Sequence, residues 1–302
     1  MEDYIVFSLS QNKKLAQEVA SKLQVELGQV SITRFSDGEL MVKTLNDVKN
    51  KNAIVIESTF KQAHERIFEL LLLLDSINRS GAASVQLFIP YFGYSRQERV
   101  SWINEPVSCE VVSKIIETAK YDSLVTFDLH HPDIEKFFTR SIINASTTDL
   151  FAEYYLNYIK EHNINIDDVV IVSPDHGSNT RADYLMHRIG GTKVILDKVR
   201  PKPNLAEHLI IDGKFVKDKI CIIIDDIIDT GGTIISAAKL LYENGAKDVL
   251  VGATHAVFST NCLTEFCKAH ICDIVVTNTI EQRSIKGVTV LDICPLVIDQ
   301  IK

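Results

Sequence analysis

The sequence lacks the excess of basic residues that general nucleic-acid binders and binders of anionic membranes carry. It contains 32 lysines and arginines against 40 aspartates and glutamates, which gives a formal net charge of -8 at pH 7. Such a charge opposes long-range attraction to a polyanion, so we expect neither nucleic acid nor a membrane as a partner. Small anionic substrates stay compatible with this charge, because a local site can have the opposite sign.

Long apolar runs and targeting segments are missing as well. The leucine run at 70–74 is far too short to span a bilayer, and charged Glu69 and Asp75 flank it. The first residues, MEDYIVFSLS, contain acids where a signal peptide would have a basic region. We therefore expect a buried helix around the leucine run and a cytoplasmic location.

The six cysteines contain no C-x-x-C pair, which is the usual spacing of cysteine metal ligands. They lie in apolar segments that are typical of strands or helices. We expect them to be reduced structural thiols. The one cluster that leaves a metal site open consists of Cys262, Cys267 and Cys272.

Short apolar runs rich in β-branched residues alternate with longer segments of helical periodicity, which is typical of mostly parallel sheets covered by helices on both faces. The expected strands are 4–8, 52–58, 84–90, 123–129, 168–174, 193–197, 221–226, 249–258 and 273–278. The expected helices are 11–26, 63–80, 106–120, 149–162, 178–189, 232–244 and 260–270.

A chain of 302 residues with 46% hydrophobic residues is long enough for two domains of this α/β kind. No linker rich in Pro, Gly or Ser interrupts it. The sequence NASTTD offers turn and N-cap residues before a new helix. We therefore predict two α/β domains, residues 1–147 and residues 148–302.

The segment CIIIDDIIDTGGTI (221–234) combines an apolar strand, three carboxylates and a glycine turn. In open α/β sheets, ligands bind at the carboxyl ends of strands, and we expect this strand to end at Asp225 and Asp226. Beyond Asp229 and Thr230, the glycines Gly231 and Gly232 let the backbone turn its N–H groups toward an anion, and Thr233 begins the next helix. Carboxylates suit the hydroxyl donors of a sugar or a bridging Mg²⁺, so the segment predicts a site for a phosphorylated sugar.

Two other interpretations of this segment are possible. The magnesium strand of a P-loop NTPase also ends in acids, but the chain has no G-x-x-x-x-G-K-[ST] motif to accompany it. An ordinary strand, turn and helix with solvated acids is the second alternative. Three acids around a Gly-Gly turn make that alternative weaker.

The same segment resembles the ribose-phosphate binding motif of the phosphoribosyltransferase fold. Six segments in order then resemble the ribose-phosphate pyrophosphokinase family, and together they extend through most of the chain: RFSDGEL (34–40), IPYFGYSRQER (89–99), FDLH (127–130), VSPDHG (172–177), DKVR (197–200) and DDIIDTGGT (225–233). The resemblance implies two phosphoribosyltransferase-like domains with the active site between them. It also implies transfer of the diphosphoryl group of Mg·ATP to ribose 5-phosphate, with release of AMP.

The resemblance implies roles for residues in each of these segments. ATP is bound by Phe35, Asp37 and Glu39, supplied by a neighbouring subunit, and by Arg96, Gln97 and Arg99. Ribose 5-phosphate is bound by Asp225, Asp226, Asp229, Thr230, Gly231, Gly232 and Thr233. Because one subunit completes the ATP site of another, a homo-oligomer is implied, either a dimer or a hexamer.

The metal and the catalytic cations complete the implied site. His130 and Asp175 follow apolar strands, and the family binds Mg²⁺ at these positions. Lys198 and Arg200 are the family's catalytic pair, and they can meet the negative charge that develops on the phosphate oxygens. Prolines 201 and 203 indicate a loop that can close over the reactants.

The sequence departs from the family pattern in several places. Ser178 replaces the second glycine of the pyrophosphate loop, which would cost about 1 kcal/mol if that position requires a positive φ. HPDIEKFF replaces the usual segment after the metal histidine, Ile143 stands where an Asp is common, and Glu98 replaces an Asp. These regions serve metal, subunit contacts and regulation in the family.

Three functions stay open at this point. The first is the active pyrophosphokinase. The second is a phosphoribosyltransferase, which would share 225–233 but would not need the ATP segments near 35 and 96. The third is a non-catalytic homologue, for which loss of Lys198, Arg200 or Asp175 would be expected, and none of these is lost.

Overall fold

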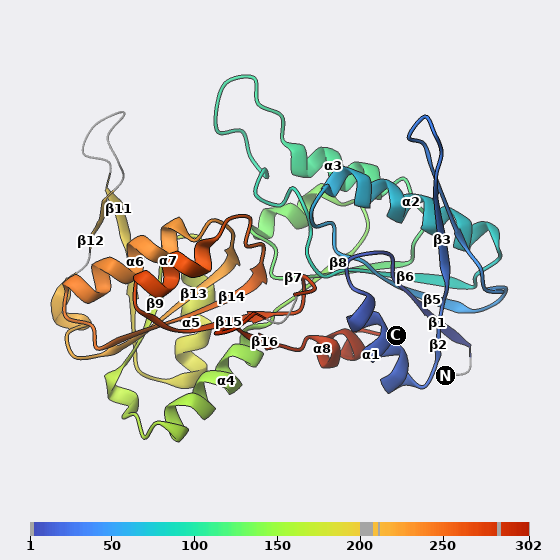
Figure 1. Cartoon of the computed structure of the whole chain (residues 1–302). Coiled ribbons are helices and arrows are strands. Elements are labelled where there is room, and N and C mark those ends of the chain that lie inside the picture. The colour runs from blue at the N-terminus through green and yellow to red at the C-terminus, as the bar shows by residue number, and fades with distance from the viewer. Residues whose placement is uncertain (1–2, 200–207, 211, 283–284, 302) are drawn as a thin grey trace. The chain divides into compact units, whose positions relative to one another are not determined.

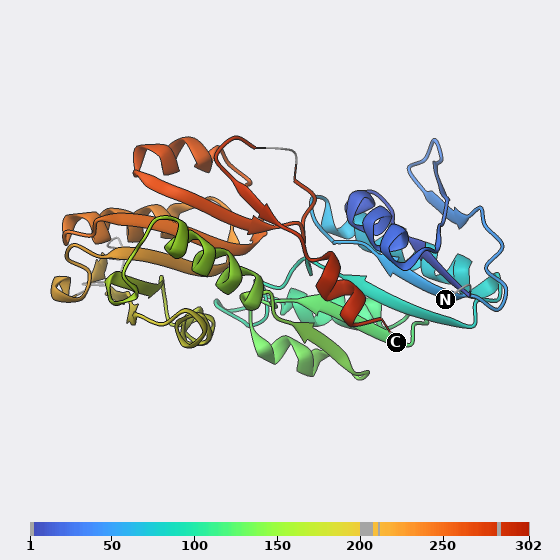
Figure 2. The same cartoon turned by 90° about the horizontal axis from the view of Figure 1, so that it is seen from below.

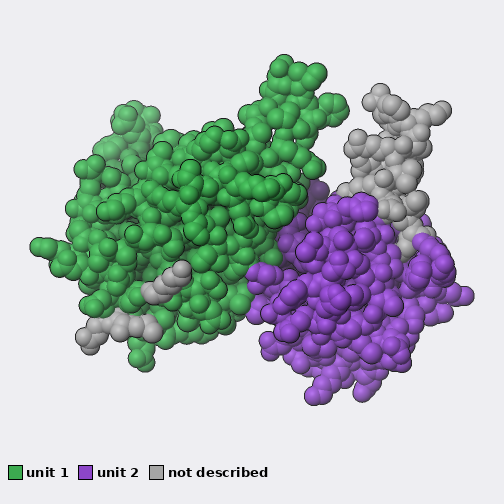
Figure 3. All heavy atoms as spheres, turned by 180° about the vertical axis from the view of Figure 1, so that it is seen from behind, with its two compact units in different colours: residues 1–145, 278–281, 292–302 green, residues 146–277, 282–291 purple. Residues whose placement is uncertain are grey.

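The computed structural model describes residues 3–199, 208–210, 212–282 and 285–301. The chain divides into two compact units (Figure 3). Unit 1 comprises residues 1–145, 278–281 and 292–302, and unit 2 comprises residues 146–277 and 282–291. The sequence prediction assigned every residue after 147 to one domain, whereas the two late segments here join unit 1.

Unit 1 contains a six-stranded parallel sheet with the order β2-β1-β5-β6-β7-β8. Its strands are β1 (Tyr4–Phe7), β2 (Glu26–Leu27), β5 (Asn52–Ile56), β6 (Ser84–Ile89), β7 (Ser123–Phe127) and β8 (Ile142–Ala145). A separate antiparallel hairpin consists of β3 (Val30–Arg34) and β4 (Leu40–Thr44). Its helices are α1 (Lys13–Leu23), α2 (Ala63–Arg79), α3 (Ser108–Ile116) and α8 (Cys294–Asp299), with the 3₁₀ turn η1 (Pro132–Phe137).

Alternating side chains of this sheet are buried on its two faces. Ile5, Phe7 and Val55 belong to a core cluster that includes Leu70 of α2 and Ile116 of α3. The side chains between them in the strands are buried on the opposite face, where α1 contacts β1 and α8 contacts α1 (Figure 1). A sheet covered on both faces explains why these strands are apolar almost throughout.

Unit 2 contains a second six-stranded parallel sheet with the order β10-β9-β13-β14-β15-β16. Its strands are β9 (Val169–Ser173), β10 (Thr192–Ile195), β13 (Ile220–Ile228), β14 (Asp248–Ala256), β15 (Ile271–Thr277) and β16 (Thr289–Leu291). A short antiparallel pair consists of β11 (Asp197–Val199) and β12 (His208–Ile210). The helices are α4 (Thr148–Glu161), α5 (Asn179–Ile189), α6 (Gly232–Glu243) and α7 (Cys262–Lys268), with the 3₁₀ turns η2 (Ile166–Asp168) and η3 (Gly213–Phe215).

Two core clusters lie on the two faces of the second sheet. Ile222 and Leu250 pack with the helices α4 and α5. Cys221 and Ile223 pack with α6 and α7 on the other face (Figures 1 and 2). The predicted α/β fold with helices on both faces of mostly parallel sheets is confirmed. None of the helices in the described ranges has both the length and the apolar character that crossing a bilayer requires.

Candidate active site

The strand, turn and helix from β13 to α6 carry the predicted sugar-phosphate residues. β13 continues to Ile228, two residues beyond the predicted end at Asp226, because it pairs with β14 over this whole length. Its pairing with β9 stops at Ile223. Asp225 and Asp226 therefore lie within the strand, in the part that extends past β9 at the carboxyl edge of the sheet, and not at the strand's end as the sequence predicted.

The carboxylates of this strand segment belong to adjacent residues, of which Asp226 is buried and Asp225 is half-buried. Asp226 is 6% exposed. Oδ1 of Asp225 accepts a hydrogen bond from the Ser178 hydroxyl at 2.5 Å and another from the Asp226 backbone N–H at 2.9 Å. Burial, followed by the charge of Asp226, raises the pKa of Asp225. A ligand that brings hydrogen-bond donors or a cation to this pair would relieve that cost.

The turn after β13 is built around Gly231, which has φ 77° and caps α6. A Cβ at this position would lie 2.6 Å from Phe266 Cε1 and 2.9 Å from Cys262 Cβ, so the turn packs directly against α7. At Gly232 the nearest atom to an added Cβ is Thr230 Oγ1, 3.8 Å away. The two glycines thus serve different purposes, since Gly231 is needed by the fold and Gly232 leaves open space.

The first turn of α6 has the features of an anion site. Gly232 and Thr233 are exposed, and the first turn contains no acidic side chain. The first N–H groups of a helix lack intrahelical partners and carry partial positive charge. An exposed helix start of this kind can bind phosphate, which fits the sequence prediction for residues 229–233.

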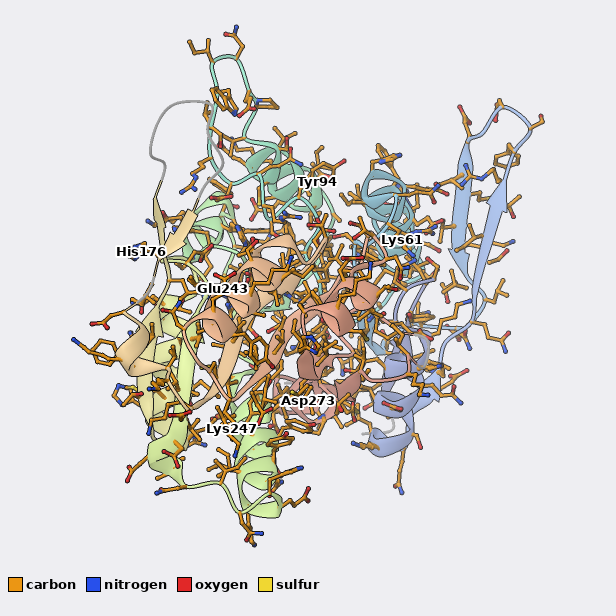
Figure 4. The ribbon with its side chains drawn as sticks, turned by 60° about the vertical axis from the view of Figure 1, so that its left-hand side comes forward. Lys61, Tyr94, His176, Glu243, Lys247 and Asp273 are labelled. Carbon is orange, nitrogen blue, oxygen red and sulfur yellow. The ribbon has the colours of Figure 1, made fainter. Side chains whose placement is uncertain are left out.

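The loop between β9 and α5 holds Asp175, two residues after β9. Its Oδ1 accepts hydrogen bonds from the backbone N–H groups of Gly177 (2.9 Å) and Ser178 (3.2 Å). Figure 4 labels His176 in the same loop. Ser178 has φ -89°, so the position does not require the left-handed conformation and the expected cost of replacing a glycine there is absent.

His130 lies in unit 1, three residues after β7. Asp128, two residues before His130, is buried and has φ 41°. This backbone conformation is strained for a residue other than glycine. The backbone N–H groups of Asp128 and Leu129 donate to Ala145 O and Asn144 Oδ1, both at 3.0 Å. These bonds hold the turn that exposes His130 at the carboxyl edge of the first sheet.

The predicted ATP loop follows β6 in unit 1. Arg96, Gln97 and Arg99 are all exposed. The loop backbone is ordered by hydrogen bonds from the Gln97 N–H to Tyr94 O (2.9 Å) and from the Cys109 N–H to Gln97 O (3.1 Å). Tyr94, labelled in Figure 4, has φ 67° and also lines an apolar cavity of about 330 Å³ between α2 and α3. Sequence reasoning did not predict this cavity.

The other predicted ATP residues lie at the tip of the β3–β4 hairpin, which extends from unit 1 (Figure 1). Phe35, Asp37 and Glu39 are exposed, and the tip is closed by a hydrogen bond from the Phe35 N–H to Glu39 O at 2.8 Å. An ion pair between Arg34 and Glu65 ties the hairpin to α2. An aromatic ring that is 47% exposed at such a tip is available to a partner outside its own hairpin.

The predicted catalytic pair, Lys198 and Arg200, is only partly within the described chain. The backbone of Lys198 belongs to β11 and pairs with Leu209 of β12. Arg200 and the prolines at 201 and 203 lie outside the described residues. The roles of Lys198 and Arg200 stay predictions.

Within unit 2 the structure brings Asp175, Ser178 and Asp225 into one hydrogen-bonded group. His130 belongs to unit 1, so its predicted pairing with Asp175 stays a prediction. Among the described residues, the one group with metal-ligand spacing is Glu18, Asp292 and Cys294. The cysteines of the predicted cluster, all free thiols, are not part of it.

Comparisons with known proteins match most of this chain. Residues 4–119 match the N-terminal domain of ribose phosphate pyrophosphokinase, and residues 191–302 match the phosphoribosyl synthetase-associated domain. The chain is 38% identical to the ribose-phosphate pyrophosphokinase of Bacillus caldolyticus over 299 residues, which covers 98% of this chain and 93% of that one. It is 39% identical to the enzyme of Bacillus subtilis, with 98% and 92% covered.

A solved structure agrees in fold along the chain. The crystal structure of phosphoribosylpyrophosphate synthetase from Mycobacterium smegmatis has a TM-score of 0.88 to this chain at 30% sequence identity, covering 99% of this chain and 97% of that one. Sequence and fold thus agree over nearly the full length. The chain belongs to the ribose-phosphate pyrophosphokinase family.

Proposed function

We propose that the chain transfers the diphosphoryl group of ATP to the C1 hydroxyl of ribose 5-phosphate, which yields 5-phosphoribosyl 1-diphosphate and AMP for nucleotide biosynthesis. The hydroxyl oxygen loses its proton to solvent and forms a bond to the β-phosphorus, the bond between that phosphorus and the α,β-bridging oxygen breaks, and AMP leaves. The observation that carries the proposal is family membership over almost the whole chain, joined to a glycine turn beside the buried Asp226 and the half-buried Asp225.

Ribose 5-phosphate is assigned to unit 2. Its phosphate binds the turn and first helical residues, 229–233, where Gly232 leaves open space and the exposed helix start attracts anions. Its ring hydroxyls donate to Asp225 and Asp226. With this assignment one ligand brings hydroxyl donors to the two carboxylates and phosphate oxygens to the N–H groups at the start of α6.

ATP is assigned to Arg96, Gln97 and Arg99 of one subunit and to Phe35, Asp37 and Glu39 of another. The exposure of Phe35 at the end of a projecting hairpin supports this sharing. The protein is accordingly proposed to be a homo-oligomer, either a dimer or a hexamer. Lys198 and Arg200 neutralise the charge that develops on the transferred group.

Mg²⁺ is proposed as the metal that accompanies ATP, held by Asp175 with His130. The carboxylate of Asp175 fits a hard cation, because its Oδ1 is already oriented by two backbone N–H groups. When bound, Mg²⁺ neutralises phosphate oxygens and so favours attack by the sugar hydroxyl.

Transfer of label from β-labelled ATP to ribose 5-phosphate tests this function. We expect the label in 5-phosphoribosyl 1-diphosphate and unlabelled AMP in an equal amount. Formation of AMP should depend on ribose 5-phosphate. A phosphoribosyltransferase would instead consume 5-phosphoribosyl 1-diphosphate in the presence of a base. Binding of both substrates without AMP formation would indicate the non-catalytic homologue.

A further inference from the structure

Ser178 connects the proposed ribose 5-phosphate site with the proposed metal ligand Asp175. Its hydroxyl donates to Asp225 Oδ1 at 2.5 Å, and its backbone N–H donates to Asp175 Oδ1 at 3.2 Å. The residue is only 3% exposed. The bonds link the loop after β9 to β13, the neighbouring strand in the sheet.

The use of the Ser178 side chain is unusual for its position. Ser178 is the N-cap residue of α5, where a serine oxygen normally accepts a hydrogen bond from an N–H of the first helical turn. Ser178 makes no such side-chain cap bond. Its hydroxyl donates to the Asp225 carboxylate instead. The first turn of α5 therefore has no side-chain cap from Ser178, and Asp225 has an additional hydrogen-bond donor.

We propose that Ser178 is a positioning residue for ribose 5-phosphate, which it serves by fixing the Asp225 carboxylate that accepts from the sugar hydroxyls. The proposal rests on the proposed function. Two donors, the Ser178 hydroxyl and the Asp226 N–H, converge on Oδ1 of Asp225. With that oxygen held, the plane of the carboxyl group is fixed before the ligand binds, and less ordering is needed on binding.

The hydroxyl also favours the charged form of Asp225. Burial and the charge of Asp226 raise the pKa of this carboxyl, whereas the bond from Ser178 and the charge of Arg181 lower it. A protonated Asp225 has less capacity to accept from a diol. Removing the hydroxyl should therefore weaken sugar binding most at the acidic end of the pH range.

The test uses the full chain with two separate substitutions. Ser178→Ala removes the hydroxyl, and Ser178→Thr keeps it. We expect Ser178→Ala to raise the KM for ribose 5-phosphate about tenfold or more, as expected for a bond to a charged group. The KM for ATP should stay within about twofold, and Ser178→Thr should recover most of the affinity. The acid limb of kcat/KM for ribose 5-phosphate should move to higher pH in Ser178→Ala.

Three controls separate positioning from general damage. Ser113→Ala removes another buried hydroxyl, which donates to Cys109 O at 2.8 Å within α3, and should leave the KM for ribose 5-phosphate unchanged. In an Asp225→Ala background, Ser178→Ala should have no further effect on that KM. If Ser178→Ala does not fold, Ser178→Gly removes the hydroxyl at a position with φ -89° at small cost to the cap.

An unchanged KM for ribose 5-phosphate in Ser178→Ala, or an equal loss in the Asp225→Ala background, would overturn the proposal. Calorimetric binding of ribose 5-phosphate to wild type and Ser178→Ala tests it independently of turnover. If the variant binds ribose 5-phosphate more weakly but the wild type forms no AMP, the positioning role of Ser178 is supported and the proposed reaction is refuted.

Discussion

The two adjacent glycines of the β13–α6 turn should respond in opposite ways to the same substitution. Gly231→Ala places a residue with a side chain at φ 77°, which costs about 1–2 kcal/mol. The added Cβ would also lie 2.6 Å from Phe266, and such overpacking typically costs about 1–3 kcal/mol. Together we expect a loss of roughly 2–5 kcal/mol in the free energy of unfolding.

Gly232→Ala is the matched variant. An added Cβ has its nearest neighbour at 3.8 Å, and the position begins a helix, where alanine is preferred to glycine by up to about 1 kcal/mol. We expect no loss of stability. If the phosphate of ribose 5-phosphate occupies the open space, the methyl group will obstruct it, and the KM for ribose 5-phosphate should rise at least about tenfold with an unchanged KM for ATP.

Urea denaturation followed by circular dichroism measures the stabilities, and steady-state kinetics measures the KM values. The reasoning on packing would be refuted if Gly231→Ala were as stable as wild type. The placement of the phosphate would be refuted if Gly232→Ala were stable and bound ribose 5-phosphate normally.

Three further predictions concern other residues. Lys198→Ala should lower kcat by about a thousandfold with little change in either KM, because it acts on charge that develops in the transition state; an unchanged kcat in steady-state assays would remove it from the chemistry. Phe35→Ala should raise the KM for ATP roughly tenfold without changing the melting temperature, since the ring is exposed; a lower melting temperature with unchanged KM would assign it to folding. Burial raises the pKa of Glu57 from 4.5 to about 7. The folded state therefore holds this proton more tightly than the unfolded state does. The free energy of unfolding should consequently fall by roughly 3 kcal/mol as pH rises from 4.5 to 7. Glu57→Gln should remove this fall in urea titrations, and a wild type whose stability does not change over that range would contradict the assignment.

The main sheets and helices were predictable because burial on both faces leaves a strong local signal. β9, for example, is buried along its whole length and apolar in all but its last residue, Ser173. The β3–β4 hairpin was missed, since its strands are half-exposed and mix polar with apolar residues. α8 was missed because six residues give too little periodicity.

The assignment of the C-terminal segment to unit 1 depends on contacts between distant parts of the chain. α8 contacts α1. The buried Asn12 side chain donates to Thr279 O at 3.1 Å, and the Ser58 hydroxyl donates to the same oxygen at 2.6 Å. Pairs that are more than 200 residues apart leave no local pattern, so a prediction based on order along the chain kept the segment with its sequence neighbours.

The candidate site shows the same division between local and distant information. The glycine turn was evident from 225–233 alone, but the bond between Ser178 and Asp225 joins residues 47 positions apart. Glu57 had no signal either, although its carboxylate accepts from the backbone N–H groups of Leu9, Ser10 and Gln11. In the sequence it is one acid after an apolar strand.

The combination of acids with an anion-binding turn explains why a phosphorylated sugar should bind at this edge of unit 2 more tightly than inorganic phosphate or a neutral sugar alone. Inorganic phosphate would pair with the first N–H groups of α6, yet it would bring a negative charge near Asp225, whose charged form is already disfavoured by burial and by the charge of Asp226. A neutral sugar would supply donors to the acids but leave the helix start to water. Ribose 5-phosphate has its hydroxyls and its phosphate at opposite ends, so the acids receive donors while the added charge stays on the side of the helix dipole. The overall charge of -8 is therefore no obstacle to an anionic substrate, because the sign that matters is set locally by one helix start.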